Sequence, residues 1–394
     1  MFMSSDKSVD VIIVGGGVIG LSIAYHLSLK GISCFVFDRG EIGQEASLAA
    51  AGILGAMMET DAPGPLVELC LASQTRFPVL AETLLAETGI DIEYVTSGLV
   101  GVARTELEQQ ALVRKCEWAQ NLGQSIEWHS TSELRALEPL LSEELLGGIY
   151  IPNDHQVNNA KLTQAFHRGA VLHGAQFFEN NPVLRLITVG NRVTGVVAAD
   201  GEYTADKVIL ATGSWSEQLA SSLGLSLHVY PVKGQCFSAQ LRKKVLHRSV
   251  FAEKCYLIPK RDGSILVGAT QEEVGFNKET TVQGIQALYN IAVSMVPDMR
   301  EAIFIRTWAG FRPGNPNIKP ILGPVREWQN VILATGHFRK GILLSAITGE
   351  IVTSMVSGTE SPIDWSPFAL DSHINIEKEH PIVTSINDCT TNDY

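Results

Sequence analysis

The sequence feature that most constrains the fold is a glycine-rich turn near the start of the chain, Gly15-x-Gly17-x-x-Gly20. It follows a β-branched run at residues 9–14 and opens a segment, residues 18–30, in which apolar residues recur at helical spacing. In such a strand–turn–helix unit the first glycine allows the tight turn, the second lets the backbone approach a pyrophosphate, and the third lets the helix pack on the strand. The turn therefore predicts a dinucleotide site in an α/β domain.

A second strand pattern, at residues 33–37, extends this segment to a βαβ unit with parallel strands. Asp38 ends that strand, 23 residues after Gly15, where a carboxylate can accept hydrogen bonds from a ribose. NAD and FAD fit this arrangement equally well. A glycine-rich turn that binds no ligand is the alternative interpretation.

A perfect hexapeptide repeat helps to choose between the two cofactors. VILATG occurs at residues 208–213 and again at 331–336, each copy an apolar strand ending in small residues. Ligands of open α/β sheets bind beyond the carboxyl ends of the strands, where Ala-Thr-Gly leaves room for an extended cofactor. A helical pattern at 342–355 follows the second copy, and the partial positive charge at its N-terminus suits a reduced, anionic flavin. These features favour FAD, although a buried strand sequence can also recur by chance.

The region between the two copies has a different pattern, with polar residues between apolar ones, as in an antiparallel sheet with one solvated face. We expect a mixed or antiparallel second domain here. Strands are predicted at residues 228–239, 255–260, 265–270 and 303–312, with a hairpin loop at 261–264. Elsewhere, helical patterns are predicted at residues 66–87 and 104–146, with a strand at 98–103.

The predicted fold class is α/β plus α+β: a discontinuous Rossmann-like FAD-binding domain with an inserted substrate domain built on an antiparallel sheet. The length of 394 residues also suits two domains. The FAD-binding domain is assigned to residues 1–85, 155–225 and 320–372, and the substrate domain to residues 86–154 and 226–319. Residues 373–394 form a polar tail without clear periodicity, which we expect to be mobile.

Composition excludes several kinds of partner. The chain has 30 basic and 42 acidic residues, a net charge of −12 that disfavours nucleic acid and anionic membranes. The six cysteines form no CxxC pair and no zinc-type spacing, so neither a disulfide framework nor a metal site is expected. The longest apolar stretch, residues 48–58, is too short to cross a bilayer, and the N-terminus lacks signal-peptide features. We expect a cytoplasmic protein that binds small molecules.

Beyond these patterns, five segments carry a family resemblance: VIIVGGGVIGLSIAYHL at 11–27, AAAGIL at 49–54, PVKGQ at 231–235, AGFRPG at 309–314 and ATGHFRKGILL at 334–344. In order, over about residues 9–368, the chain resembles the D-amino-acid oxidase superfamily of FAD-dependent oxidoreductases, and within it the bacterial glycine oxidases of the thiamine pathway. The resemblance implies noncovalent FAD and oxidation of a primary or secondary amine to an imine. It further implies reduction of O2 to hydrogen peroxide, hydrolysis of the imine to a 2-oxo acid and ammonia, and a homotetramer.

The same resemblance assigns candidate site residues. With the three glycines of the turn, the cofactor candidates are Val18, Ile19, Asp38, Arg39, Ala46, Ser47, Ala51, Gly52, Ile53, Val183, Gly213, His337, Phe338, Arg339, Lys340, Gly341, Ile342 and Leu343. The candidate catalytic and substrate-binding residues are Tyr256, Arg312 and Arg339. Lys254 stands where glycine oxidases can carry His and Gln271 where they carry Met, so the resemblance leaves the substrate preference open.

Physical chemistry supports some of these roles independently. A guanidinium offers two parallel donors to a carboxylate, and Pro313 holds Arg312 extended, so that its side chain can reach a cleft. Tyr256 begins an alternating strand and could equally be a core aromatic. His337 fits a cofactor wall better than a general base, because hydride transfer from a neutral amine to flavin N5 needs no carbanion.

The sequence thus predicts oxidative deamination of glycine or a similarly small amine such as sarcosine or D-Ala. The alternatives within the superfamily are a D-amino-acid oxidase, an N-methyl-amino-acid oxidase and a quinone-linked dehydrogenase. An NAD-linked dehydrogenase would leave the motifs of Arg312 and Arg339 unexplained. A flavin-binding protein with a decayed pocket is disfavoured by the intact set of Arg312, Tyr256 and Arg339.

Overall fold

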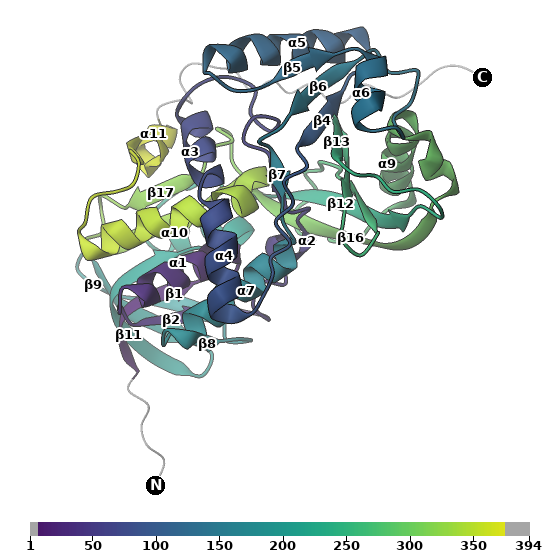
Figure 1. Cartoon of the computed structure of the whole chain (residues 1–394). Coiled ribbons are helices and arrows are strands. Elements are labelled where there is room, and N and C mark those ends of the chain that lie inside the picture. The colour runs from purple at the N-terminus through teal and green to yellow at the C-terminus, as the bar shows by residue number, and fades with distance from the viewer. Residues whose placement is uncertain (1–6, 375–394) are drawn as a thin grey trace.

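The computed structural model describes residues 7–374, which form two eight-stranded sheets, a two-stranded ribbon and the helices that cover them (Figure 1). The strands are β1 Ser8–Val14, β2 Cys34–Phe37, β3 Ile53–Leu54, β4 Leu99–Val102, β5 Glu127–His129, β6 Gly148–Ile151, β7 His155–Gln156, β8 Gln176–Phe178, β9 Val183–Val189, β10 Arg192–Ala198, β11 Gly201–Leu210, β12 Tyr230–Gln240, β13 Ser249–Ala252, β14 Cys255–Pro259, β15 Ile265–Gly268, β16 Ile303–Gly314, β17 Ile321–Pro324 and β18 Val331–Thr335. The helices are α1 Val18–Leu29, α2 Ala46–Ala49, α3 Pro65–Gln74, α4 Phe77–Thr88, α5 Glu106–Asn121, α6 Thr131–Leu137, α7 Asn159–Leu172, α8 Ser216–Ser221, α9 Val282–Met295, α10 Gly341–Ser357 and α11 Leu370–Ile374.

The first sheet has the order β17-β18-β11-β1-β2-β8, and the hairpin β9–β10 extends from β11. β1 is parallel to β2 and to β11, which confirms the βαβ unit predicted from the glycine turn. β11 is also parallel to β18, and the two hexapeptide copies pair in register, Val208 with Val331 and Leu210 with Leu333. The sheet therefore collects strands from the beginning, middle and end of the chain.

Both faces of this sheet are buried. Val11 and Ile13 of β1 belong to the core under α1, α7 and α10, three helices on one side of the sheet (Figure 1). Ile12 and Val14 point to the other face, into a second core that includes Leu186 of β9. Burial on two faces explains why β1 is a nearly continuous apolar run without alternation.

The second sheet has the order β16-β12-β15-β14-β13-β4-β6-β5 and lies in the other half of the molecule with α5, α6 and α9 (Figure 1). Its long neighbouring strands β12 and β16 are antiparallel, as are β12 and β15, and β14 and β15. The sequence left open a mixed or an antiparallel sheet, and the parallel pairing of β13 with β4 makes it mixed. The sheet is mixed, since its fifth and sixth strands come from distant parts of the chain.

The prediction of one solvated face was wrong for the centre of this sheet. Phe237 of β12 packs in the core under α9, whereas its neighbour Cys236 packs on the opposite face with Ala51 and Leu266. The first half of the chain covers that opposite face, and the alternation of β12 could not reveal it. Solvent reaches the edge strand instead, at the start of β16, where Ile303 to Thr307 are exposed.

The helical predictions were also too coarse. Residues 66–87 form two helices, α3 and α4, separated at Thr75 and Arg76. Residues 104–146 contain the strand β5 between α5 and α6. Of the tail predicted at 373–394, the first two residues complete α11 and the others lie outside the described residues. Over residues 7–374, no helix combines the length and apolarity needed to cross a membrane.

Asn330, just before β18, provides a test of how the first sheet is held together. Its side-chain amide nitrogen donates to the carbonyls of Val193, at 2.6 Å, and Asp206, at 2.7 Å, and its carbonyl oxygen accepts from the amide of Val193 at 3.0 Å. Asn330→Ala would take these partners from the buried amide and carbonyl of Val193, at roughly 1–3 kcal/mol each, so we expect unfolding free energy to fall by about 2–6 kcal/mol. The carbonyl of Asp206 keeps a hydrogen bond from the guanidinium of Arg192, at 3.0 Å. Urea denaturation measures this loss. The control Asn191→Ala, at an exposed position in the β9–β10 turn, should change it by less than about 0.5 kcal/mol.

Candidate active site

A cavity of about 420 Å³ runs from the glycine turn to the second sheet. Val14 at the end of β1, Phe37 at the end of β2, Ala211 after β11 and Thr335 at the end of β18 contribute to its wall. Because these strands are parallel, their carboxyl ends meet at one edge of the sheet, the usual ligand position in open α/β sheets. Residues of β12, β14 and β16 close the far end of the cavity.

The glycine turn packs closely on its neighbours, so that its backbone atoms form part of the cavity wall. Gly15 adopts a φ of +111°, and a Cβ there would collide with the carbonyl of Ala211. A Cβ on Gly20 would collide in turn with the carbonyl of Gly15, so α1 can approach β1 only with glycine at this position. Gly17 forms the N-cap of α1, and the amide of Val18 donates to the hydroxyl of Ser47 at 2.8 Å.

Asp38 holds the neighbouring loop as well as facing the cavity. One carboxylate oxygen accepts from the amide of Gly16 at 2.8 Å and the other accepts from the amide of Gly40 at 2.9 Å. Burial raises the pKa of Asp38, while the two hydrogen bonds act in the opposite direction. Each carboxylate oxygen can accept a further hydrogen bond, so Asp38 can hold the turn and a ribose together.

Two residues cover the part of the cavity beside Asp38. The guanidinium of Arg39 lies 3.6 Å from the centre of the Trp215 ring and also forms an ion pair with Glu45 at 3.2 Å. Trp215 stacks on Phe276, with 5.0 Å between ring centres. Arg39 was predicted from the sequence and Trp215 was not, although Trp215 follows the first hexapeptide copy closely.

The other end of the cavity holds the candidate substrate-binding residues. Arg312 reaches it from the end of β16, and one of its nitrogens donates to the carbonyl of Thr270 at 3.0 Å. The guanidinium lies against Gly234 of β12, where a Cβ would be only 2.5 Å from two of its nitrogens. Gly234, part of the PVKGQ segment, thus supplies the space that Arg312 occupies.

Tyr256 and His337 line the same region. The hydroxyl of Tyr256 lies 3.9 Å from the sulfur of Cys236, and burial raises the pKa of this tyrosine well above its usual value. The ring of His337 is buried, with Nε2 3.2 Å from the hydroxyl of Thr348. Burial lowers the pKa of His337 to about 3, so the ring is neutral near pH 7, as a cofactor wall requires.

The structure brings most of the predicted site residues to this one cavity. Those that line it are Gly15, Gly17, Val18, Ile19, Asp38, Arg39, Ala46, Ser47, Ala51, Gly52, Ile53, Val183, Gly213, Tyr256, Arg312, His337, Phe338, Arg339, Gly341 and Ile342.

Five residues singled out from the sequence lie elsewhere. Gly20 packs on the turn, the ammonium of Lys340 donates to the carbonyl of Glu59 at 2.7 Å, and Leu343 is buried in the core. Lys254 and Gln271 are exposed and do not line the cavity. Sequence reasoning also did not name four lining residues: Glu59, Trp215, Gly234 and Cys236. Gly234 lies within the PVKGQ segment, Cys236 directly follows it, and Trp215 follows the first hexapeptide copy, so the quoted motifs pointed to these three but not to Glu59.

The fold and cavity define an enzyme that binds a dinucleotide beside a second, smaller ligand. Residues 10–355 match the family described as FAD dependent oxidoreductase. Glycine oxidase from Geobacillus kaustophilus is 38% identical over 369 residues, which cover 93% of this chain and 97% of the relative. Hydrogen cyanide synthase subunit HcnC from Pseudomonas protegens is 33% identical, over 92% of this chain and 95% of the relative. The crystal structure of the Geobacillus kaustophilus glycine oxidase superposes with a TM-score of 0.89 at 37% identity, covering 92% of this chain and 98% of that one.

The chain therefore belongs to the FAD-dependent oxidoreductase family. FAD is the cofactor, and the reaction class is the flavin-dependent oxidation of an amine. The residues present fit FAD, because the close-packed glycine turn and Asp38 lie at one end of the cavity and α10 begins at the other. No side chain caps the first turn of α10, so its free N–H groups favour negative charge there. Within residues 7–374 no cluster of side chains suits a metal ion.

Proposed function

We propose that this enzyme oxidises glycine or a similarly small amine, such as sarcosine or D-Ala, to the imine. The observation that carries the proposal is the guanidinium of Arg312, fixed against Gly234 at the end of the cavity away from the glycine turn. There it can hold the carboxylate of an amino acid by two parallel hydrogen bonds. The glycine oxidase relatives support the same substrate class.

Bound FAD supplies the two-electron acceptor, and the side chains of the site orient the substrate toward it. Arg312 holds the carboxylate, Tyr256 covers the substrate, and Arg339 provides a second contact at the cavity wall. The neutral ring of His337 completes the wall without placing a positive charge there. Holding the Cα–H bond in a fixed direction is the main contribution that this reaction needs from the protein.

We further propose that the electrons pass to O2, which gives hydrogen peroxide. Water then hydrolyses the released imine to a 2-oxo acid and ammonia. In this mechanism the enzyme holds FAD noncovalently, because the chain has no cysteine between Cys255 and Cys389, the sequence region around Arg312. D-amino-acid oxidase, N-methyl-amino-acid oxidase and quinone-linked dehydrogenase activities are the alternatives.

The domain division predicted from the sequence also stays a proposal. Strands of the first sheet all fall within residues 1–85, 155–225 and 320–372, and strands of the second within 86–154 and 226–319, which supports it.

A substrate series tests the proposed function. When Arg312 holds the carboxylate and the Cα–H bond points at the flavin, the amine and the side chain take the two remaining positions around Cα. In an L-amino acid the amine and the side chain would occupy each other's positions. We expect peroxide from glycine, sarcosine and D-Ala, with the extra methyl of D-Ala changing kcat/KM by no more than about 1–3 kcal/mol. Peroxide formation with these three, D-Phe and L-Ala at equal concentration measures the ranking. Turnover of L-Ala, or a strong preference for D-Phe over glycine, would contradict the proposal.

Gly234 offers a test of Arg312 that leaves the arginine in place. Gly234→Ala puts a methyl group where the guanidinium lies, so Arg312 must move and its hold on the carboxylate weakens. We expect kcat/KM for glycine to fall in Gly234→Ala, but by less than in Arg312→Ala, because the guanidinium ends a flexible side chain and can shift. For Arg312→Ala we expect a loss of about 2–5 kcal/mol, as for truncating one partner of a buried charge pair. Steady-state kinetics measure both variants, and FAD content serves as the control for an intact fold. Normal kinetics in Arg312→Ala would remove Arg312 from the substrate site.

The exposed start of β16 bears on assembly. Ile303, Phe304 and Ile305 present apolar side chains to solvent on an edge strand, which another copy of the chain could cover. We propose a homotetramer. Light scattering of the purified protein should give four times the mass of one chain, and a monomer at micromolar concentration would exclude it.

A further inference from the structure

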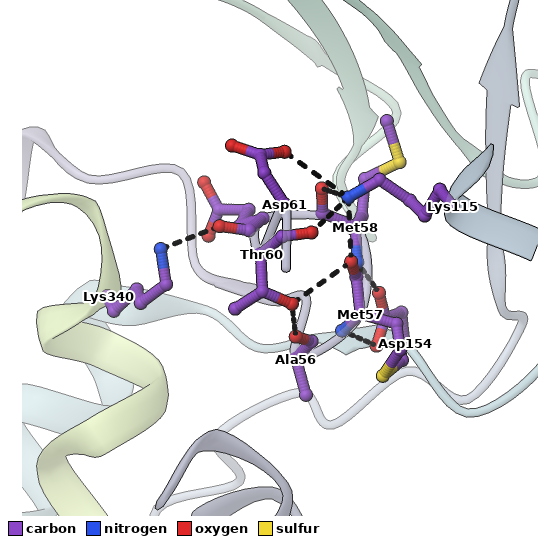
Figure 2. A network of polar contacts seen from close by, with 9 residues as sticks. Ala56, Met57, Met58, Thr60, Asp61, Lys115, Asp154 and Lys340 are labelled. Carbon is purple, nitrogen blue, oxygen red and sulfur yellow. Dashed lines mark hydrogen bonds and ion pairs between the residues drawn. The ribbon is translucent and has the colours of Figure 1, made fainter. Parts of the chain in front are cut away.

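The turn at residues 56–60, between β3 and α3, is held by a buried lysine from a distant part of the chain (Figure 2). The ammonium of Lys115, on α5, lies 3.1 Å from the carbonyl oxygens of both Met57 and Met58, and it also donates to the carbonyl of Thr60. Its contact with the carboxylate of Asp61 is longer, at 3.4 Å. Lys115 is buried, and three backbone carbonyls satisfy its charge instead of water.

Asp154 holds the amides of the same turn, whereas Lys115 holds its carbonyls (Figure 2). Its fully buried carboxylate accepts from the amides of Met57, at 3.2 Å, and Met58, at 2.7 Å, and from the side chain of Gln74 at 3.0 Å. Lys340, next to α10, donates to the carbonyl of Glu59. Three charged side chains, from α5, from the residue before β7 and from the residue before α10, thus hydrogen-bond to the backbone of this five-residue turn. These hydrogen bonds fix the conformation of the turn.

The turn carries the side chain of Glu59 into the cavity. Glu59 lines the cavity, and its buried Oε2 has no hydrogen-bond partner among the described residues. Its carboxylate is close enough to Tyr256 to contribute to the raised pKa of that tyrosine, on which Arg312 acts in the opposite direction. The charges of Glu59 and Arg312 therefore both act on Tyr256.

The other acidic residues that face the cavity are engaged or exposed. Both oxygens of Asp38 accept backbone hydrogen bonds, Glu45 forms ion pairs with Arg39 and Lys278, and Glu41 is exposed. A buried carboxylate oxygen without a partner is costly, and the cost falls when a ligand supplies a donor. Glu59 thus provides a negative group in the same region as the positive group of Arg312.

We propose that Glu59 binds the amino group of the substrate while Arg312 binds its carboxylate, and that Lys115 is the positioning residue that keeps Glu59 in place. This inference rests on the proposed function. An amino acid in solution carries one positive and one negative group on the same carbon, and the pair Glu59 and Arg312 matches that charge distribution. Lys115 does not line the cavity, so it acts through the turn.

The test compares glycine with acetate, which has the carboxylate and lacks the amine. Glu59→Gln keeps the shape of the side chain and removes its charge. We expect kcat/KM for glycine to fall roughly 10-fold or more, as for the loss of a hydrogen bond to a charged group, mainly through KM. The inhibition constant of acetate should stay within about twofold, because acetate depends on Arg312 alone.

Lys115→Met should give the same separation, with weaker glycine binding and unchanged acetate inhibition. Arg114→Met is the matched control, since it removes a positive charge from the adjacent, exposed position of α5. It should change neither constant. The midpoint of thermal unfolding of each FAD-loaded variant shows whether the fold survives; if Lys115→Met does not fold, Glu59→Gln still decides the proposal.

Two results would overturn the inference. One is unchanged glycine kinetics in Glu59→Gln, and the other is an equal loss for glycine and acetate, which would indicate general damage to the cavity. Failure of the proposed function would look different, because the wild-type enzyme would then fail to oxidise glycine before any variant is compared.

Discussion

The rest of the structure depends on the parallel pairing of β11 with β1 on one side and β18 on the other. This pairing joins three parts of the chain that are far apart in sequence, and it places the carboxyl ends of the strands at one edge. Close contact across that edge is possible only because Gly15 and Gly20 lack side chains. The edge forms the wall of the cavity, and strands β12, β14 and β16 of the second sheet, which lie between β11 and β18 in the chain, close its far end.

The two ends of the cavity are built by different means. At the glycine turn, backbone geometry dominates, and Asp38 contributes by holding two backbone amides. At the far end, charged side chains dominate, and each is fixed by a neighbour: Arg312 by the space at Gly234, and Glu59 by the turn under Lys115 and Asp154. In the proposed function, the glycine-turn end holds FAD and the far end selects the amine.

Much of the fold could be predicted because its signals are local. The strand–turn–helix around Gly15 spans few residues, and each hexapeptide copy is by itself an apolar strand that ends in small residues. That the two copies pair in register is seen only in the structure. Which strands of the second sheet pair in parallel could not be predicted, because the neighbours β4 and β13 lie far apart in the chain, at Leu99–Val102 and Ser249–Ala252. Burial of both faces of β12 was missed for a related reason: alternating polar residues such as Gln235 are buried and hydrogen-bonded rather than solvated.

By itself, the sequence determined the glycine turn, the strand that ends at Asp38, the two hexapeptide strands and the motif around Arg312, because each depends on backbone conformation or on residues close in the chain. Only the tertiary structure decided that Gly234 makes room for Arg312 and that the turn carrying Glu59 lies under Lys115 and Asp154. Those contacts join residues tens of positions apart. A buried charge is stabilised by whatever polar groups the fold brings to it, and a linear pattern of residues contains no record of those partners.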